Sequence, residues 1–266
     1  MSYNKLLIEE LEFFLKSSCN TEQFFNKLSP LIKHKNFLMH IAAPKTGSTW
    51  LTSMIKNDLN FYTSQLVIDY DRREQEIQLE AFYKALLKPE INYFFGHKHT
   101  RFSEYTKNFI EYFNVNVILQ CRNIFDTVIS VKDHLNQTKE NGSMSNVPKD
   151  FYNWADEQQI DFIIDTLIPW YFNFYSSWFE YIKENKNIYL ITYEDLLLDP
   201  KQELKKIYIK FNYNQESIEE ILSKKSFTRF NKGILGRGEI LNKSQKNKIV
   251  NISKYYKNVD FSSIGL

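Results

Sequence analysis

Four short apolar runs, separated by stretches of helical periodicity, are the feature that most constrains how this chain folds. The runs are 37–42 (FLMHIA), 91–95 (INYFF), 115–120 (VNVILQ) and 188–192 (IYLIT). Most of them are continuously apolar rather than alternating, which is typical of strands covered on both faces. Strands that alternate with helices form a parallel sheet, so the sequence predicts a three-layer α/β domain with a mainly parallel central sheet and helices on both faces.

Helices are expected after the apolar runs. Apolar residues recur at helical spacing over 50–59. A second helix is expected from near residue 126, and a third over roughly 160–183. A fourth begins at 199–202 (DPKQ), where the aspartate can cap, the proline suits the first helical position and the glutamine completes a capping box.

The composition predicts one domain over residues 1–266. The chain holds only 7 glycines and 6 prolines, which argues against long linkers, and its 43% of hydrophobic residues is ample for a single core. Within this domain, 1–35 are expected to form an amphipathic helical extension. The polar, aperiodic segment 136–150 is expected to form a mobile loop.

Charge and cysteine content narrow the function classes. The formal net charge of +2 is nearly balanced, so we expect no general binding to nucleic acid or membrane surfaces. Acidic residues interrupt the apolar residues near the N-terminus, unlike a signal peptide, and no run approaches the roughly 18 apolar residues of a membrane span. A soluble, cytoplasmic protein is expected. Cys19 and Cys121 are too few for a disulfide framework, and Cys121 is expected in the core.

Chemically capable side chains follow each apolar run at the point where it ends. Residues 45–49 (KTGST) follow the first run and 96–99 (GHKH) the second. Arg122 follows the third, and 193–195 (YED) follow the fourth. Ligands bind at the carboxyl ends of the strands in an open parallel sheet, so these four segments predict a single site.

The segment 43–50 (APKTGSTW) has the composition of a phosphate-binding loop. It precedes a predicted helix, whose free N–H groups and dipole favour an anion. Lys45 adds a positive charge, and Thr46, Ser48 and Thr49 add hydroxyl donors. The lysine comes before the glycine, so the Gly-x-x-x-x-Gly-Lys-Ser/Thr pattern of nucleoside triphosphatases is absent. An ordinary strand-to-helix turn is the alternative.

A second anion site is predicted around Arg122. Ser130 lies eight residues on, about two helical turns away. The later segment 224–248 is rich in lysine and arginine, and its glycines allow a close backbone approach to a ligand. Two anion sites predict a ligand with phosphate-like groups at both ends. The alternatives are a surface salt bridge from Arg122 to Asp126 and a solvated hydroxyl at Ser130.

Taken together, these segments resemble the cytosolic-type sulfotransferases, which use 3′-phosphoadenosine 5′-phosphosulfate (PAPS). Residues 44–50 look like their 5′-phosphosulfate loop and 121–130 (CRNIFDTVIS) like their 3′-phosphate motif. Residues 193–195 resemble the tyrosine-containing strand end near the adenine. Residues 231–236 (NKGILG) are similar to the Arg-Lys-Gly-x-x-Gly stretch that closes over the 3′-phosphate. The motifs follow the family's order over roughly 37–250, and the resemblance implies the family's P-loop-like α/β fold.

The resemblance also implies roles for individual positions. The 5′-phosphosulfate would be bound by Lys45, Thr46, Gly47, Ser48 and Thr49. The 3′-phosphate would be bound by Arg122, Ser130, Asn231, Lys232 and Gly233. Asn231 replaces an arginine of the family, which should weaken one contact unless Arg229 or Arg237 compensates. Trp50 and Phe227 would pack on the two faces of the adenine and Tyr193 would reach an adenine nitrogen, with core packing as the alternative for these three aromatic residues.

The implied reaction is transfer of the sulfuryl group of PAPS to a hydroxyl or amine of a small-molecule acceptor, leaving PAP and requiring no metal. His99 matches the catalytic position of the family and would act as general base, while Lys45 would stabilise the leaving phosphate. Animal members have Lys-Thr-His-Leu-Pro here, so His97 stands where their lysine would be. This leaves open whether Lys98 supplies that charge or His97 is the base.

Two other functions remain open from the sequence. A P-loop nucleotide kinase would need ATP, magnesium and a lysine directly after the glycine. A non-catalytic relative would bind PAP without transferring sulfate. The acidic and tyrosine residues within 61–90 suit either a cationic acceptor or a solvated face, and the oligomeric state is not readable.

Overall fold

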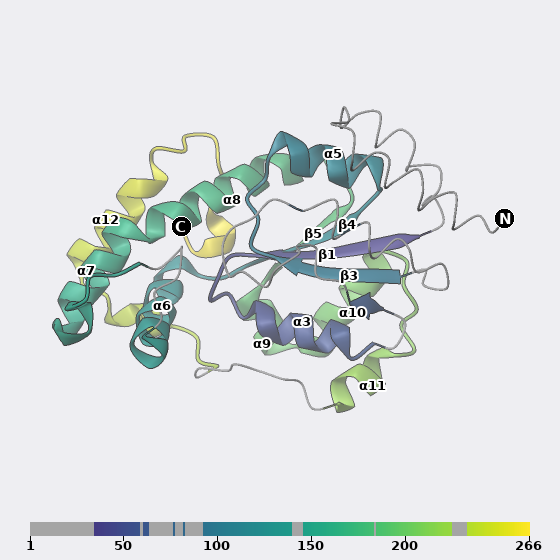
Figure 1. The fold of residues 1–266 in the computed structure, drawn as a ribbon, viewed down its shortest axis with the longest axis horizontal. Helices are drawn as coiled ribbons and strands as arrows, with labels where there is room; N and C mark the ends of the chain where they lie inside the picture. The colour runs from purple at the N-terminus through teal and green to yellow at the C-terminus, as the bar shows by residue number, and fades with distance from the viewer. Residues whose placement is uncertain are drawn as a thin grey trace, which may run out of the picture.

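The computed structural model describes residues 35–58, 61–63, 77, 82, 93–139, 146–183, 185–224 and 233–266. Within these residues one five-stranded sheet has the order β2-β3-β1-β4-β5, with all neighbours parallel (Figure 1). The strands are β1 (Asn36–Ala42), β2 (Tyr62–Thr63), β3 (Tyr93–Lys98), β4 (Asn116–Cys121) and β5 (Ile188–Thr192). The parallel sheet predicted from the apolar runs is therefore confirmed.

Strand β1 lies at the centre of the sheet, so its carboxyl end is flanked by the ends of β3 and β4. His40 on β1 pairs in register with His97 on β3 and with Ile118 on β4. Ala42, the last residue of β1, is paired with Gln120 of β4. This register brings the polar residues at the three strand ends together at one edge.

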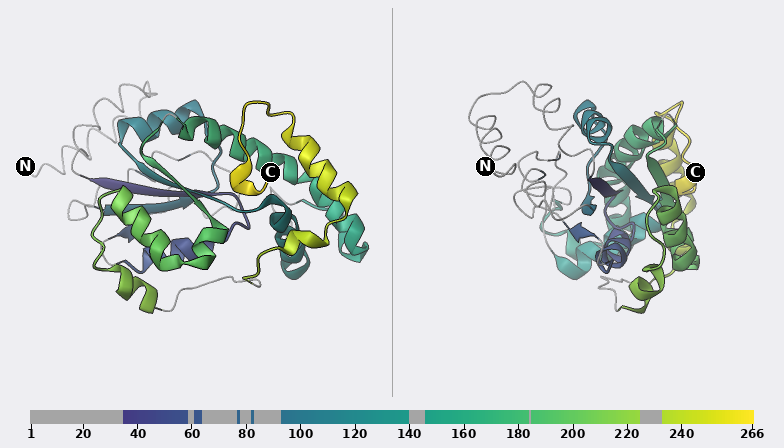
Figure 2. Two further views of the ribbon diagram at one scale, coloured as in Figure 1. Left: turned by 180° about the vertical axis from the view of Figure 1, so that it is seen from behind. Right: turned by 90° about the vertical axis from the view of Figure 1, so that its right-hand side faces the viewer.

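Helices cover both faces of the sheet, as expected for three layers (Figures 1 and 2). On one face lie α3 (Ser48–Lys56), α9 (Tyr193–Leu198), α10 (Pro200–Lys210) and α11 (Ile218–Ser223). On the other lie α5 (Glu104–Tyr112) and α8 (Ile168–Ile182). Toward the carboxyl ends of the strands, the domain continues with α6 (Ile124–Thr138), α7 (Asp156–Thr166) and α12 (Lys243–Ser253), and with the 3-10 turns η1 (Phe151–Asn153), η2 (Arg237–Ile240) and η3 (Ser262–Ile264).

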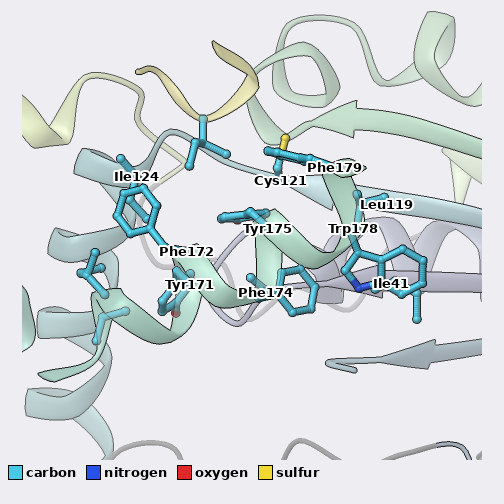
Figure 3. Close-up of a cluster of buried hydrophobic side chains, with 14 of the residues drawn as sticks. Ile41, Leu119, Cys121, Ile124, Tyr171, Phe172, Phe174, Tyr175, Trp178 and Phe179 are labelled. Carbon is cyan, nitrogen blue, oxygen red and sulfur yellow. The ribbon is translucent and has the colours of Figure 1, made fainter. Parts of the chain in front are cut away.

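The core is divided between the two faces of the sheet. Helix α8 is aromatic along its length and packs against the sheet beside Ile41, Leu119 and Cys121 (Figure 3). Cys121 is completely buried, as predicted. Under α3 and α10, a second cluster includes Leu38 and Ile118, which come from the same strands but point to the opposite face. Successive residues of a strand face opposite ways, so both layers are built from the same apolar runs.

The expected single helix over 160–183 is wrong, because two helices cover this region. Helix α7 ends at Thr166 and α8 begins at Ile168. Pro169 occupies the first turn of α8. A proline lacks the backbone N–H that a continuing helix would use, but it is well suited to a helix start. By contrast, the predicted Asp199 cap before α10 is confirmed, since its carboxylate accepts from the Gln202 backbone N–H at 2.9 Å. The predicted capping box is not formed, because the Asp199 N–H donates to the Asp195 carbonyl.

Three further boundaries differ from the sequence analysis. Helix α6 runs to Thr138, so the start of the expected loop 136–150 is helical, and residues 140–145 lie outside the described part. Strand β3 extends to Lys98, so Gly96, His97 and Lys98 lie on the strand rather than after it. The basic segment 224–248, for which the sequence analysis names no helix, contains the start of α12. The expected N-terminal extension falls on residues 1–34, which are also outside the description.

None of the helices in the described ranges is both long enough and apolar enough to cross a lipid bilayer.

Candidate active site at the carboxyl ends of the strands

The backbone carbonyl groups of the loop between β1 and α3 accept hydrogen bonds from the rest of the protein. Every carbonyl from Ala42 to Gly47 accepts a hydrogen bond, most of them from side chains of other elements. The donors, in order of the carbonyl, are His99 Nδ1 (2.6 Å), Thr46 Oγ1 (2.8 Å), Tyr171 Oη (2.9 Å), Arg122 Nη1 (3.2 Å), Gln120 Nε2 (2.8 Å) and Trp50 N (3.0 Å). The loop is therefore held in place by β4, α8 and the residue that follows β3.

The bound carbonyls fix the direction of the backbone N–H groups. The C=O and the following N–H of a trans peptide point in opposite directions, and no cis peptide is present among the described residues. No described residue accepts a hydrogen bond from the backbone N–H of Thr46, Gly47 or Ser48. These donors lie at the N-terminus of α3, where the helix dipole favours negative charge. Such an array of backbone donors suits an anion.

Gly47 is required at its position for two reasons. Its φ of 81° lies in the left-handed region, which glycine adopts at little cost. A Cβ atom there would also lie 2.4 Å from Cδ2 of Tyr193. Lys45 is in the left-handed region as well, with φ of 65°, a conformation uncommon for a residue with a side chain. The turn into α3 therefore depends on two residues of unusual backbone geometry.

Arg122 joins the end of β4 to this loop. Besides its hydrogen bond to the Lys45 carbonyl, its guanidinium carbon lies 4.4 Å from the centre of the Tyr193 ring. Its Nη2 lies 3.9 Å from Oδ2 of Asp126, and both side chains of this pair are buried. The predicted alternative is therefore right about the partner, Asp126, but wrong about a surface location. The Nε of Arg122 is buried and has no hydrogen-bond partner in the described structure.

The other residues expected around the phosphates are described only in part. Ser130 on α6 is 3% exposed, so it is not a solvated hydroxyl. Gly233 is described and has a positive φ of 61°. Phe227, Asn231 and Lys232 lie outside the described residues.

Asp126 on α6 holds the backbone of residues 236–238 in place. Its carboxylate accepts hydrogen bonds from the backbone N–H of Gly236 at 3.0 Å and of Gly238 at 2.7 Å. Arg237 forms an ion pair at 2.5 Å with Asp133, which lies on α6 like Asp126. The guanidinium of Arg237 is thus already engaged, which argues against its compensating for Asn231.

The two histidines at the end of β3 differ in their environments. His99 Nδ1 must donate to the Ala42 carbonyl, which can only accept, so the lone pair of the neutral ring is on Nε2. Burial lowers the pKa of His99, and the hydrogen bond to Ala42 partly opposes this. Burial, followed by the proximity of His99, lowers the pKa of His97 much further, and His97 Nε2 is buried without a partner. The geometry therefore favours His99 over His97 as a base.

Lys98 lies between these histidines in the sequence and is partly exposed. Burial lowers the pKa of its ammonium group to about 8. It remains largely protonated at neutral pH, so it supplies a positive charge next to His99 in the chain.

Tyr193 and Trp50 are the described residues expected at the adenine. Tyr193 begins α9 and is 5% exposed, with its ring between Gly47 and the Arg122 guanidinium. Trp50 is partly buried and packs against the core cluster under α3. Both lie at the strand-end edge next to the loop.

Three residues that hold the loop were not found from the sequence, namely His40, Gln120 and Tyr171. His40 and Gln120 are completely buried, and each lies next to apolar residues on its strand. A polar residue inside an apolar run was the available signal, because a buried polar group requires a hydrogen-bond partner. Tyr171 carried no such signal among the many aromatic residues of α8.

The sequence profile of the sulfotransferase domain matches residues 35–233, about three quarters of the chain. The chain belongs to this family. No curated protein matches this sulfotransferase in sequence. The family assignment confirms the resemblance read from the loop, the Arg122 motif and the strand ends.

Solved structures of several other proteins have the same fold. The mouse sulfotransferase SULT7A1, solved with PAP, is 17% identical with a TM-score of 0.61, over 89% of this chain and 90% of that one. Retinol dehydratase, solved with androsterone and the inactive cofactor PAP, is 15% identical with a TM-score of 0.55, over 89% and 86%. A sulfotransferase from Alicyclobacillus acidocaldarius is 12% identical with a TM-score of 0.50, over 86% and 98%.

Proposed function

We propose that this sulfotransferase moves the sulfuryl group of PAPS to a hydroxyl or amine of a small-molecule acceptor, with His99 as general base. The observation that carries the proposal is the loop between β1 and α3. Its carbonyls are bound by the protein, while the N–H groups of Thr46, Gly47 and Ser48 have no acceptor among the described residues. Such an array of donors at a helix N-terminus suits the 5′-phosphosulfate.

Arg122 would bind the second phosphate of the nucleotide. Its buried, unpartnered Nε is a donor that costs free energy unless an acceptor reaches it. A phosphate oxygen is such an acceptor, and the charge-assisted bond would be stronger than a neutral one. The buried hydroxyl of Ser130 and the backbone near Gly233 would complete this site. The presence of PAP in the mouse and retinol dehydratase structures supports the same nucleotide here.

The reaction would be an in-line displacement at sulfur. The acceptor oxygen or nitrogen forms a bond to sulfur as the bond from sulfur to the bridging phosphate oxygen breaks. The acceptor proton passes to Nε2 of His99, and the electron pair of the broken bond remains on the 5′-phosphate of PAP. General-base assistance of this kind contributes about 10²–10⁴-fold to a rate.

Lys45 would stabilise the negative charge that develops on the leaving oxygen. It is the cation of the loop itself, and its carbonyl is held by Arg122. A fixed positive group at developing charge commonly contributes about 10²–10³-fold. Three points remain predictions: that the reaction needs no metal, that the acceptor is a small molecule, and that the protein is cytoplasmic.

Two measurements test the proposal. In a thermal-shift assay, PAP is expected to raise the Tm of the protein more than ATP with Mg²⁺ does, and the reverse result would favour a nucleotide kinase. The protein is then incubated with ³⁵S-labelled PAPS and a panel of phenols, alcohols, amines and sugars. Transfer of label to an acceptor is expected. Binding of PAP without transfer to any acceptor would indicate a non-catalytic relative.

A further inference from the structure

A chain of hydrogen bonds beneath the anion-binding loop joins four residues from β1, β4, the loop and α3. His40 Nδ1 lies 2.9 Å from Oγ1 of Thr52 on α3. His40 Nε2 lies 2.8 Å from Oε1 of Gln120 on β4. Gln120 Nε2 lies 2.8 Å from the carbonyl oxygen of Thr46 in the loop. All four residues are buried, and His40, Gln120 and Thr46 completely so.

The direction of every bond in this chain is determined. A carbonyl can only accept, so the Gln120 amide donates to Thr46 and its oxygen faces His40. His40 Nε2 must therefore carry a hydrogen and donate to that oxygen. In a neutral ring, Nδ1 is then the acceptor for the Thr52 hydroxyl. Burial lowers the pKa of His40 to about 3, so the ring is neutral at physiological pH.

We propose that His40 and Gln120 are positioning residues that hold the Thr46–Gly47 peptide with its N–H toward the 5′-phosphate of the nucleotide. This inference rests on the proposed function. Gln120 binds the Thr46 carbonyl, and the Gly47 N–H points the opposite way across the trans peptide. His40 holds the Gln120 amide in the one orientation that places its donor on the loop. Without His40, the Gln120 oxygen loses its donor, so the amide is held at one end only.

A role in packing alone does not explain these two residues. On the same face of the sheet, the residues two positions before His40 and Gln120 are Leu38 and Ile118, which are apolar, although His97 lies beside His40 on β3. An apolar pair would continue that layer without the cost of burying polar atoms. The polar pair specifies something that an apolar pair cannot, namely the orientation of one loop peptide.

The test compares affinities for adenosine 3′,5′-bisphosphate and adenosine 3′-phosphate, measured by isothermal titration calorimetry. The Kd for the 3′-phosphate divided by the Kd for the bisphosphate isolates the contribution of the 5′-phosphate. In Gln120→Leu, this ratio is expected to fall at least tenfold, about the value of a hydrogen bond to a charged group. In His40→Leu, the ratio of the two Kd values is also expected to fall. His40→Gln keeps a donor for Gln120 and is expected to restore the ratio to within about threefold.

Gln159→Leu is the matched control. Gln159 is also a buried glutamine whose amide donates to backbone carbonyls, those of Phe151 and Trp154, but it lies on α7 away from the loop. This variant is expected to lower the Tm and leave the ratio unchanged. If Gln120→Leu does not fold, Gln120→Met keeps the length of the side chain and removes the donor without adding a charge, and the same fall is expected.

Two results would overturn the inference. Equal loss of affinity for both nucleotides in the Gln120 variants would show a merely structural role, with the proposed function intact. A wild-type protein that binds the bisphosphate no better than the 3′-phosphate would remove the proposed function itself.

Discussion

The Nδ1 atom of His99 lies 2.6 Å from the carbonyl oxygen of Ala42, which is the last residue of the central strand. The proposed base is therefore bound to the same backbone that continues into the loop between β1 and α3. One hydrogen bond sets both the tautomer of the imidazole and its position relative to the donor site.

Replacing His99 by alanine is expected to lower kcat by about 10²–10⁴-fold, because the acceptor proton loses its base. The Kd for PAP should change by less than about threefold, since His99 is not a nucleotide ligand in this proposal. Steady-state kinetics and calorimetry give the two quantities. The matched variant is His97→Ala, and a larger loss of kcat there than in His99→Ala would reassign the base.

The pH dependence of kcat/KM follows from the environment of His99. The ring acts as a base only when neutral, so activity is lost as pH falls through its pKa. Burial lowers that pKa below its ordinary value of 6.5. Activity is therefore expected to persist below pH 6.5 and to decline at more acidic pH. An acid limb centred above 6.5 would show that the titrating group is not this histidine.

Lys45→Met is expected to lower kcat by about 10²–10³-fold, because the charge that develops on the leaving oxygen is no longer neutralised. The methionine keeps the length and apolar stem of the lysine. Kinetics with saturating PAPS measures the effect on the chemical step. Unchanged kcat would remove Lys45 from the leaving-group role and limit it to the turn.

Arg122→Ala is expected to weaken PAP binding by about 10–100-fold, the value of a buried hydrogen bond to a charged group. Adenosine 5′-phosphate lacks the 3′-phosphate, so its affinity should fall much less. A small loss is still expected for it, because Arg122 also binds the Lys45 carbonyl. Equal losses for the two nucleotides in calorimetry would place Arg122 away from the 3′-phosphate.

His40 makes folding stability sensitive to acid. Its pKa is about 3 in the folded protein and near 6.5 when unfolded. Between these values only the unfolded state binds the proton, so the free energy of unfolding falls with decreasing pH by on the order of 1 kcal/mol per pH unit for this group. His40→Gln, which does not titrate, should reduce that slope in urea unfolding between pH 6.5 and 5. An identical slope would contradict the assignment.

The sequence was sufficient to predict the parallel sheet, apart from β2, and helices on both of its faces, because continuous apolar runs are local patterns. It did not predict the break before Pro169, since the apolar period continues on both sides of that residue. The contacts of His40 could not be predicted from the sequence either. Gln120 lies 80 residues away, and only the register of β1 with β4 brings the two together.

Local composition also did not predict where strand β3 ends. Strand β3 continues through Gly96 to Lys98 because pairing with β1 extends to Ile41, which no pattern within residues 91–98 indicates. The roles predicted for Phe227, Asn231 and Lys232 fall on residues outside the described part, and they stay predictions.

The contact between Gly47 and the ring of Tyr193 makes these two positions interdependent in any redesign of this enzyme. A loop grafted from another nucleotide-binding protein, with even an alanine at position 47, would collide with the tyrosine. Enlarging residue 47 therefore calls for a smaller residue at 193, and that change would in turn remove the aromatic surface on which Arg122 rests. Engineering of donor specificity here has to treat the three side chains as one set.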